Sequence, residues 1–428
     1  MSTPNQAVAA ALLFCLGATV VAADVTAGSN AGAFAALCGI IGLAETPITL
    51  PTQPEDPTAS YKKLRKLNMT LAPQEWRTSF NKKGDNDQWE AADKPSKMPS
   101  EEWTELWPQW LEDAQQLTAP KARQAVLEEE QLTGLTEGEL KHLTPKVATA
   151  TNAVRILIAK YNELKADLAA VTADSAKADL NLIVYGNAKP TGRAVVIGEA
   201  FGSSAGTWQA VCEGNAAQHN AKTLAAVAYC LCCKNSNSVD GTDKVCSPQQ
   251  TGASDWNPSQ APGTTQWAEI RKLCALRPLK VLTAATLSAR IAAITNHMST
   301  DGTSTYLGHF IKTGCTGSKS NGQCVKYTDI AEGDTTKLAT IPWLQKLDTL
   351  HDKLLKQEAA NAAARRIDLV ISSITNNIKG LANEARIQTL HATTNSKKST
   401  DSAKQTQQVS SAECQNITEK SKCKDNCE

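Results

Sequence analysis

Residues 154–182, VRILIAKYNELKADLAAVTADSAKADLNL, decide the fold class of this 428-residue chain. Apolar or small side chains recur there at alternating steps of three and four residues, with Lys, Glu and Asp between them and no Pro or Gly inside. A seven-residue repeat of this length is typical of a long helix that packs in a coiled coil. The stripe consists of Val154, Leu157, Tyr161, Leu164, Leu168, Val171, Ser175, Ala178 and Leu182.

A second stripe of the same kind spans residues 343–390, and its Ala-rich patch at 359–364 allows another helix to approach closely. Two such helices cannot bury their stripes alone, so we predict the arms of an antiparallel bundle. Shorter apolar helices are predicted over residues 31–43 and 278–298. The side chains that we expect to be inaccessible in the seam are Leu164, Leu168, Ile371, Ile374 and Ile378.

The predicted fold is mainly α: an elongated antiparallel coiled-coil helical bundle with loop-rich, disulfide-bonded lobes and a small disulfide-rich C-terminal module. Five Trp occur within residues 76–110, and we interpret this stretch as a loop-rich lobe pinned to the bundle by indoles rather than as a ligand-stacking site. The predicted boundaries are a signal peptide at 1–23, an N-terminal helical-bundle coat domain at 24–394, a flexible linker at 395–410 and the start of a truncated C-terminal disulfide domain at 411–428.

The charge balance argues against a nucleic-acid partner. Lys and Arg number 44 and Asp and Glu 43, a formal net charge of +1, whereas a nucleic-acid binder needs an excess of cations to neutralise phosphates. Hydrophobic residues at 41% and charged residues at 20% are ordinary for a folded protein. With only six His, the chain has few general bases or metal ligands.

The N-terminal segment has the pattern of a secretory signal peptide. Residues 7–23 form an apolar run that ends in Val21-Ala22-Ala23, with the small residues that signal peptidase accepts, so we predict cleavage before Asp24. The run is too short to be a convincing membrane span, and a buried N-terminal helix is the alternative. Two sequons, at Asn68 and Asn416, are the expected N-glycosylation sites of a secreted chain.

Thirteen cysteines point to an oxidising compartment and a disulfide framework. Cys315 and Cys324 are separated by Gly, Ser, Thr and Asn, which predicts a self-contained bridged loop; the connectivity of the others stays open. Adjacent Cys232 and Cys233 would need different partners. Removal of Cys15 with the signal peptide leaves twelve cysteines. Those of the N-terminal domain are Cys38, Cys212, Cys230, Cys232, Cys233, Cys246, Cys274, Cys315 and Cys324. Cys414, Cys423 and Cys427 belong to the C-terminal domain, and we expect the cysteine pattern of that domain to be truncated here.

The sequence also contains one candidate catalytic motif and one candidate metal-binding motif. Gly202-Ser203-Ser204-Ala205-Gly206 matches the nucleophile elbow of hydrolases and follows the strand-like Ala194–Ile197, but the chain lacks the alternating strands and helices that place such a serine. The cysteines around 230–233 could bind zinc, but their gaps do not fit a structural zinc site. We therefore expect no catalytic, cofactor-binding or metal-binding residues.

The residues together resemble the variant surface glycoproteins that coat African trypanosomes. The resemblance covers essentially the whole chain and rests on the signal peptide, on NAGAFAALCGIIGLA at 30–44 and on the heptad helices framing Cys-rich loops. Its most specific part is SSAECQNITEKSKCKDNCE at 410–428, which is similar to the opening of the family's C-terminal domain. The crowding of Cys in the later half is similar to the class B N-terminal domain.

The resemblance implies a non-enzymatic coat glycoprotein that shields the parasite membrane from host antibody and complement by antigenic variation. It implies that a glycosylphosphatidylinositol (GPI) anchor in the outer leaflet is the sole link to the membrane. It also implies that the chain forms a homo-oligomer, either a dimer or a trimer, and contacts neighbouring coat molecules. It also implies O-linked hexose on Ser318 or Ser320. The alternative is a coiled-coil surface receptor for a host serum ligand.

Overall fold

The computed structural model describes residues 24–82, 88–92, 101–202, 206–237, 239, 241–275, 279, 281–312 and 314–414. These residues divide into two compact units. The disulfide unit comprises residues 24–52 and 167–359, and the helical unit comprises residues 53–166 and 360–414. The fold is mainly α, as predicted, although the predicted single domain at 24–394 corresponds to parts of both units.

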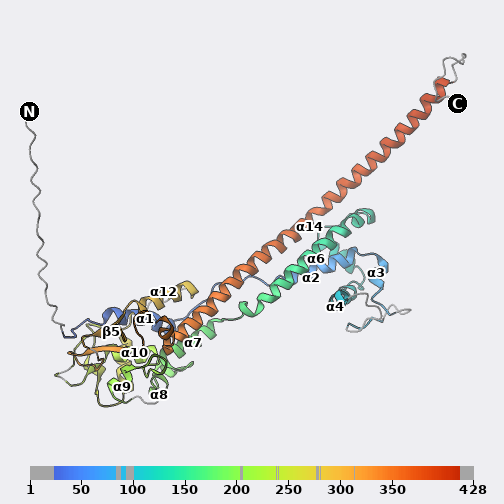
Figure 1. The fold of residues 1–428 in the computed structure, drawn as a ribbon. Helices are drawn as coiled ribbons and strands as arrows, with labels where there is room; N and C mark the ends of the chain where they lie inside the picture. Colours follow the sequence, from blue (N-terminus) through green and yellow to red (C-terminus); the bar gives the residue numbers. More distant parts are fainter. Residues whose placement is uncertain are drawn as a thin grey trace, which may run out of the picture. The chain divides into compact units, whose positions relative to one another are not determined.

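The helical unit is built from helices, of which two are long and run side by side (Figure 1). Its helices are α2 (Thr58–Leu71), α3 (Gln74–Thr78), α4 (Glu101–Gln116), α5 (Ala122–Glu129), most of α6 (Glu137–Leu168) and the later part of α14 (Pro342–Cys414). The buried seam includes Leu64 of α2, Val154 of α6 and Ile371 of α14. Lys146 of α6 forms an ion pair with Glu384 of α14. This heptad packing is the coiled coil that the stripes predict.

The prediction of one continuous helix over residues 154–182 is wrong. The chain leaves helix α6 at Leu168 and begins α7 (Ala173–Tyr185) after Thr172, whose side chain forms a capping box with Ser175. Gln357 of α14 is buried and donates hydrogen bonds to the carbonyls of Leu168 and Val171, at 2.8 and 2.7 Å. The break therefore has its own cap and its own side-chain support.

Other boundaries also differ from the prediction. Residues 395–410 are helical as part of α14 rather than a flexible linker, since no Pro or Gly interrupts them. Helix α12 covers only Ala284–Thr295, and Met298 begins strand β4. Leu168, Ile371 and Ile378 are buried as predicted, whereas Leu164 is only half-buried, and so is Ile374, which packs against the edge of the seam.

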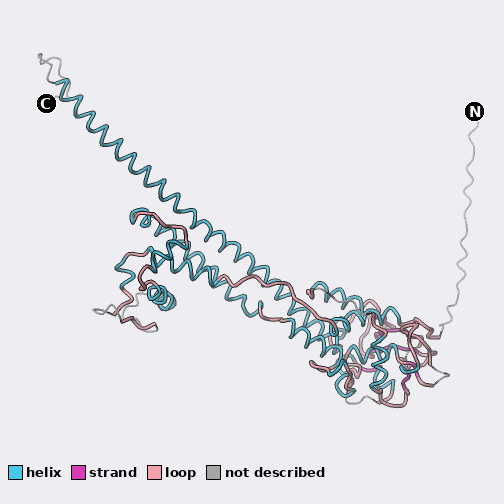
Figure 2. Tube along the Cα trace, turned by 180° about the vertical axis from the view of Figure 1, so that it is seen from behind, coloured by secondary structure: helices cyan, strands magenta, loops and turns pink. Residues whose placement is uncertain are grey.

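The disulfide unit holds every strand that the described residues form, as the magenta segments in Figure 2 show. Strands β1 (Glu213–Gly214), β6 (Gly322–Tyr327), β5 (Thr305–Phe310) and β4 (Met298–Thr300) form one sheet in that order, and β2 (Lys234–Asn235) pairs with β3 (Asp255–Trp256). Antiparallel β5 and β6 pair Thr305 with Tyr327 at one end. The sequence reasoning missed this small sheet.

All residues of the apolar helix α10 (Leu224–Cys232) are buried in the core of the disulfide unit, whose other helices are mostly short. They are α1 (Ala31–Glu45), α7, α8 (Ile197–Ala200), α9 (Trp208–Cys212), α11 (Thr264–Lys272), α12, α13 (Thr335–Leu338) and the start of α14, with 3₁₀ turns at Thr191–Arg193, Ala216–Gln218 and Gly252–Ser254. Helix α1 closely follows the predicted 31–43. Residues 194–196, read as strand-like, form no strand.

Candidate functional site: the bridged loop and the tryptophan cavity

Four disulfides tie the disulfide unit together. They join Cys38 to Cys274, Cys212 to Cys230, Cys232 to Cys246 and Cys315 to Cys324. The Cys38–Cys274 bridge closes the longest loop, with a sequence separation of 236 residues. Cys414 lies at the end of α14, and Cys423 and Cys427 lie outside the described residues.

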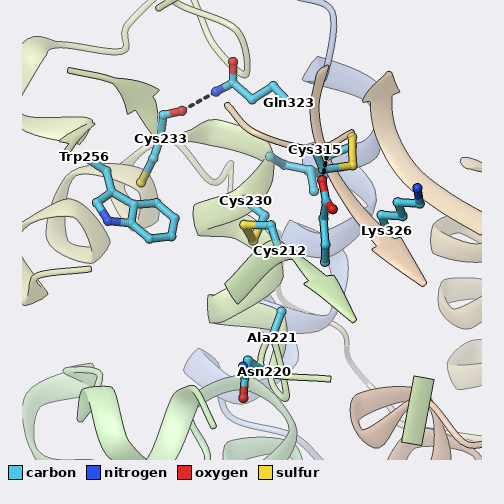
Figure 3. Close-up of a disulfide and its surroundings, with 12 residues drawn as sticks. Cys212, Asn220, Ala221, Cys230, Cys233, Trp256, Cys315, Gln323 and Lys326 are labelled. Carbon is cyan, nitrogen blue, oxygen red and sulfur yellow. Dashed lines mark hydrogen bonds between the residues drawn. A yellow bond between two sulfur atoms is a disulfide. The ribbon is translucent and has the colours of Figure 1, made fainter. Parts of the chain in front are cut away.

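Cys233 is a free, buried thiol, so the adjacent cysteines Cys232 and Cys233 do not both form bridges. In Figure 3 its sulfur lies apart from the Cys212–Cys230 bridge, and its backbone carbonyl accepts a hydrogen bond from the Gln323 amide. Burial raises the pKa of this thiol well above its usual range, which keeps it protonated and inert. Across the described ranges, no group of three or more His, Cys, Asp or Glu is placed to hold a metal ion.

The bridged loop 315–324 connects β5 to β6 and carries both predicted O-glycosylation residues. Ser320 is exposed and Ser318 is half-buried, with their hydroxyl oxygens 3.0 Å apart. Gly317 has φ +73°, and a Cβ at this position would meet the Trp208 ring at 2.6 Å. The turn thus requires glycine, and it presents Ser320 as the more accessible hydroxyl.

The first sequon lies inside helix α2. Asn68 is half-buried, Met69 and Thr70 are buried, and the Thr70 hydroxyl donates to the carbonyl of Lys66 at 2.8 Å. Among the described residues, no hydrogen bond engages the Asn68 side chain. The second sequon at Asn416 lies outside the described residues, as does Ser204 of the hydrolase motif.

A cavity of about 370 Å³, called here the tryptophan cavity, lies within the helical unit between α2, α4 and α6. Three half-buried indoles stand edge to face on its wall: Trp76–Trp103, Trp76–Trp110 and Trp103–Trp110 have ring centroids 5.3, 5.4 and 5.4 Å apart. The cavity is lined by Tyr61, Arg65, Asn68, Met69, Trp76, Trp103, Leu106, Trp110, Ala148, Thr151, Asn152 and Arg155.

The described residues between Trp76 and Trp110 form more regular structure than the predicted loop-rich lobe. Trp103, Trp107 and Trp110 are spaced three and four residues apart on α4, and buried Trp107 forms a hydrophobic cluster with Phe80, which the other indoles pack against. This spacing is a helical signal that the sequence reasoning did not use. Tyr61, Arg65 and Asn68 have the same periodicity on α2, which could have placed Asn68 on one face of a helix with Tyr61 and Arg65.

Arg65 fixes the position of α4 against α2. Its guanidinium donates to Gln109 at 2.6 Å, Glu112 at 2.8 Å and Asp113 at 2.9 Å. Burial raises the pKa of Asp113 to about 6, despite the opposing effect of the Arg65 charge. This buried ion pair holds the tryptophan wall in place.

The disulfide unit contains its own buried charge, the Glu45 carboxylate. Arg271 donates to it twice, at 2.6 and 2.9 Å, the Tyr185 hydroxyl donates at 2.8 Å, and Arg193 lies at 3.5 Å. These partners satisfy the carboxylate, and we interpret the network as a structural support for α1.

The comparisons with known proteins agree with this architecture. A family model described as the trypanosomal VSG (variant surface glycoprotein) domain matches residues 10–373. Variant surface glycoprotein ILTAT 1.23 of Trypanosoma brucei brucei is 24% identical over 427 residues, which cover 98% of this chain and 79% of that protein. Because the family model matches well over half of the sequence, the chain belongs to the trypanosomal variant surface glycoprotein family, a family of cell-surface coat glycoproteins.

Proposed function

We propose that this trypanosomal variant surface glycoprotein is a GPI-anchored coat molecule that shields the parasite plasma membrane from host antibody and complement by antigenic variation. The observation that carries the proposal is the family match over residues 10–373. The fold supports it physically, because loops held on a disulfide-locked core can change in sequence without disturbing buried residues. In this proposal the molecule acts as a physical barrier and not as an enzyme.

The proposed covalent groups are N-glycans on Asn68 and Asn416, O-linked hexose on the bridged loop and the lipid anchor. Of the two loop serines, Ser320 is the better acceptor because its side chain is exposed and Ser318 is half-buried. An added sugar there would cover the surface around the loop. Anchoring through lipid alone is compatible with the described helices, none of which has the combined length and apolarity that a membrane crossing requires.

The proposed partners are further copies of the chain. Leu369, Val370 and Ile387 of α14 are large apolar side chains with exposed fractions of 69%, 47% and 54%. Contact between copies of the helical unit would remove this apolar surface from water, which favours a dimer or trimer. Neighbouring coat molecules and host antibodies would meet the remaining surface, and no nucleic-acid partner is proposed.

Phosphatidylinositol-specific phospholipase C treatment of the source cells tests the coat function. We expect release of an abundant protein that begins at Asp24, with an intact mass that falls after N-glycosidase treatment. Recovery of the protein free in the medium, with nothing released from the cells, would contradict the anchored coat.

The second candidate is a coiled-coil surface receptor for a host serum ligand, which the tryptophan cavity favours. Its volume of about 370 Å³ is at the low end of the range for ligand pockets, roughly 300–1,000 Å³. Saturable binding of a serum component to the purified protein, lost on Trp103→Ala, would support the receptor. Absence of such binding would leave the coat function alone.

A further inference from the structure

We propose that the tryptophan cavity seats the first sugar residues of the N-glycan carried by Asn68. The glycan then belongs to the packed structure of the helical unit instead of projecting freely from it. This inference rests on the N-glycosylation of Asn68 proposed above and goes beyond it by assigning the sugar a binding site.

The position of Asn68 is the first step of the argument. Asn68 is part of the cavity wall and half-buried, and no hydrogen bond among the described residues engages its amide. An N-linked glycan is attached directly to the Nδ2 atom of its asparagine, so the first N-acetylglucosamine begins at this wall. The sugar has no need to displace an existing hydrogen bond of Asn68.

The lining of the cavity fits a pyranose. The indoles of Trp76, Trp103 and Trp110 offer aromatic surface to the carbon-bound hydrogens of a sugar ring and to the methyl of an N-acetyl group. Thr151 and Asn152 provide polar groups for sugar hydroxyls, and Arg155 donates to the Asn152 side chain at 3.1 and 3.0 Å. Aromatic walls with a few polar groups are the usual composition of a ligand site.

The cavity also has an exit for a longer glycan. Ala148 and Asn152 on its α6 wall are exposed, so the space between the helices is open to solvent. The innermost sugars can therefore contact the indoles while the outer branches extend into water.

The rest of the sequon shows when the sugar must be added. Thr70 is fully buried and its hydroxyl is hydrogen-bonded to the Lys66 carbonyl within α2. An oligosaccharide transferase has to reach both Asn68 and this hydroxyl, which the folded helix does not allow. The sugar is therefore attached before α2 packs, and the helical unit folds around it.

The test compares removal of the glycan from folded and unfolded full-length glycoprotein. Peptide mass spectrometry after N-glycosidase treatment reports the occupancy of Asn68 separately from Asn416. We expect the Asn68 glycan to be released at least about tenfold more slowly from the native than from the denatured chain, a factor that corresponds to about 1.4 kcal/mol. Equal release rates would overturn the inference.

Variants separate sugar contact from simple burial. Trp103→Ala should accelerate release of the Asn68 glycan from the native protein several-fold. Trp103→Phe, which keeps an aromatic ring, should accelerate this release less. Trp89→Ala is the matched control, because Trp89 packs on the same aromatic cluster without lining the cavity. If Trp103→Ala and Trp89→Ala had equal effects, the indole wall would have no specific role and the inference would fail.

Thermal melting provides an independent readout. Trp103→Ala should lower the melting temperature more in the glycosylated protein than in an Asn68→Gln background, because the variant loses its sugar contact only when the sugar is present. Equal decreases would overturn the inference while leaving glycosylation intact. Absence of any glycan on Asn68 would overturn both the inference and the glycosylation of Asn68, and the coat function would still stand on the phospholipase experiment.

Discussion

The two units of this molecule are stabilised by different means. The disulfide unit combines short helices and small sheets, and its core includes four covalent bridges around the fully buried helix α10. In the helical unit the described residues form no disulfide, and stability comes from aliphatic seams and the cluster around Trp107. Short elements bury little continuous apolar surface, whereas long helices bury a whole stripe.

This difference gives the two units different sensitivities. Cross-links act mainly by restricting the unfolded chain, so they allow many irregular loops to remain in a stable structure. A helical seam depends on the shape and polarity of each buried side chain. We therefore expect reductants to lower mainly the stability of the disulfide unit, and substitutions in the seam to lower mainly the stability of the helical unit.

The largest expected effect comes from removing the Cys38–Cys274 bridge. The paired Cys38→Ala and Cys274→Ala variant should destabilise the disulfide unit by roughly 4–5 kcal/mol, because the bridge closes a loop of 236 residues in the unfolded chain. Hydrogen exchange followed peptide by peptide would locate the loss. The matched control is the paired Cys315→Ala and Cys324→Ala variant, because the bridge that it removes closes a loop of only nine residues. Faster exchange of α2 and α4 than of α10 in the first variant would contradict the separation into units.

The corresponding change in the helical unit is Trp107→Ala, with an expected cost of about 3–5 kcal/mol. Trp107 is buried, packs on Phe80 and donates its indole N–H to the carbonyl of Ala91 at 3.0 Å. Urea unfolding monitored by limited proteolysis should show earlier cleavage within residues 53–166. Trp89→Ala, at the partly buried edge of the same cluster, should cost much less.

Heptad spacing allowed the sequence to predict the long helices but not their interruption. The stripe continues across residues 169–172 because Leu168, directly before the break, and Val171, inside it, are both buried. The capping residues Thr172 and Ser175 were visible in the sequence, but they are small and polar and did not outweigh the periodicity. The supporting contact from Gln357 arises from a residue far away in the chain.

The candidate site was predicted only in parts. Asn68, the indoles and the bridged loop were each recognised from local patterns. The meeting of Asn68 and the indoles at one cavity depends on how α2, α4 and α6 pack, which local patterns do not specify. The identity of the free thiol could not be predicted either, because the choice between Cys232 and Cys233 as partner of Cys246 is set by tertiary structure.

Acidification should act in opposite directions through two buried groups, His219 in the disulfide unit and Asp113 in the helical unit. Burial lowers the pKa of His219 to about 4, and its neutral ring accepts a hydrogen bond from the Ala221 N–H at Nδ1 and donates one from Nε2 to the Lys326 carbonyl. The unfolded state, with an ordinary His pKa near 6.5, binds more protons between pH 6.5 and 4, so the disulfide unit loses stability as the pH falls through this window. The pKa of Asp113 is raised to about 6, so at this residue the folded state binds more protons between pH 6 and 4, and the contribution of Asp113 to the stability of the helical unit rises as the pH falls.

Each of these pH effects should be at most about 3–4 kcal/mol, since one pKa unit corresponds to about 1.4 kcal/mol. Urea unfolding at pH 4.5, 5.5 and 6.5, with proteolysis to identify the unfolded unit, measures them. His219→Gln should flatten the pH dependence of the disulfide unit, and Asp113→Asn that of the helical unit. If the free energy of unfolding changed with pH equally in the wild type and in the variant, another group in that unit would be responsible for the pH dependence.

The smallest expected effect is at the break between α6 and α7. Gln357→Leu keeps an apolar stem of similar size but removes both hydrogen bonds to the Leu168 and Val171 carbonyls, at an expected cost of about 1–2 kcal/mol. Gln345→Leu, on an exposed position of the same helix, is the matched control. Because Gln357 and the break both belong to the disulfide unit, faster hydrogen exchange should stay within residues 167–185. If hydrogen exchange were accelerated equally in the helical-unit seam around Leu64 and Ile371, the break would couple the two units. The stability of one unit would then not be independent of the stability of the other.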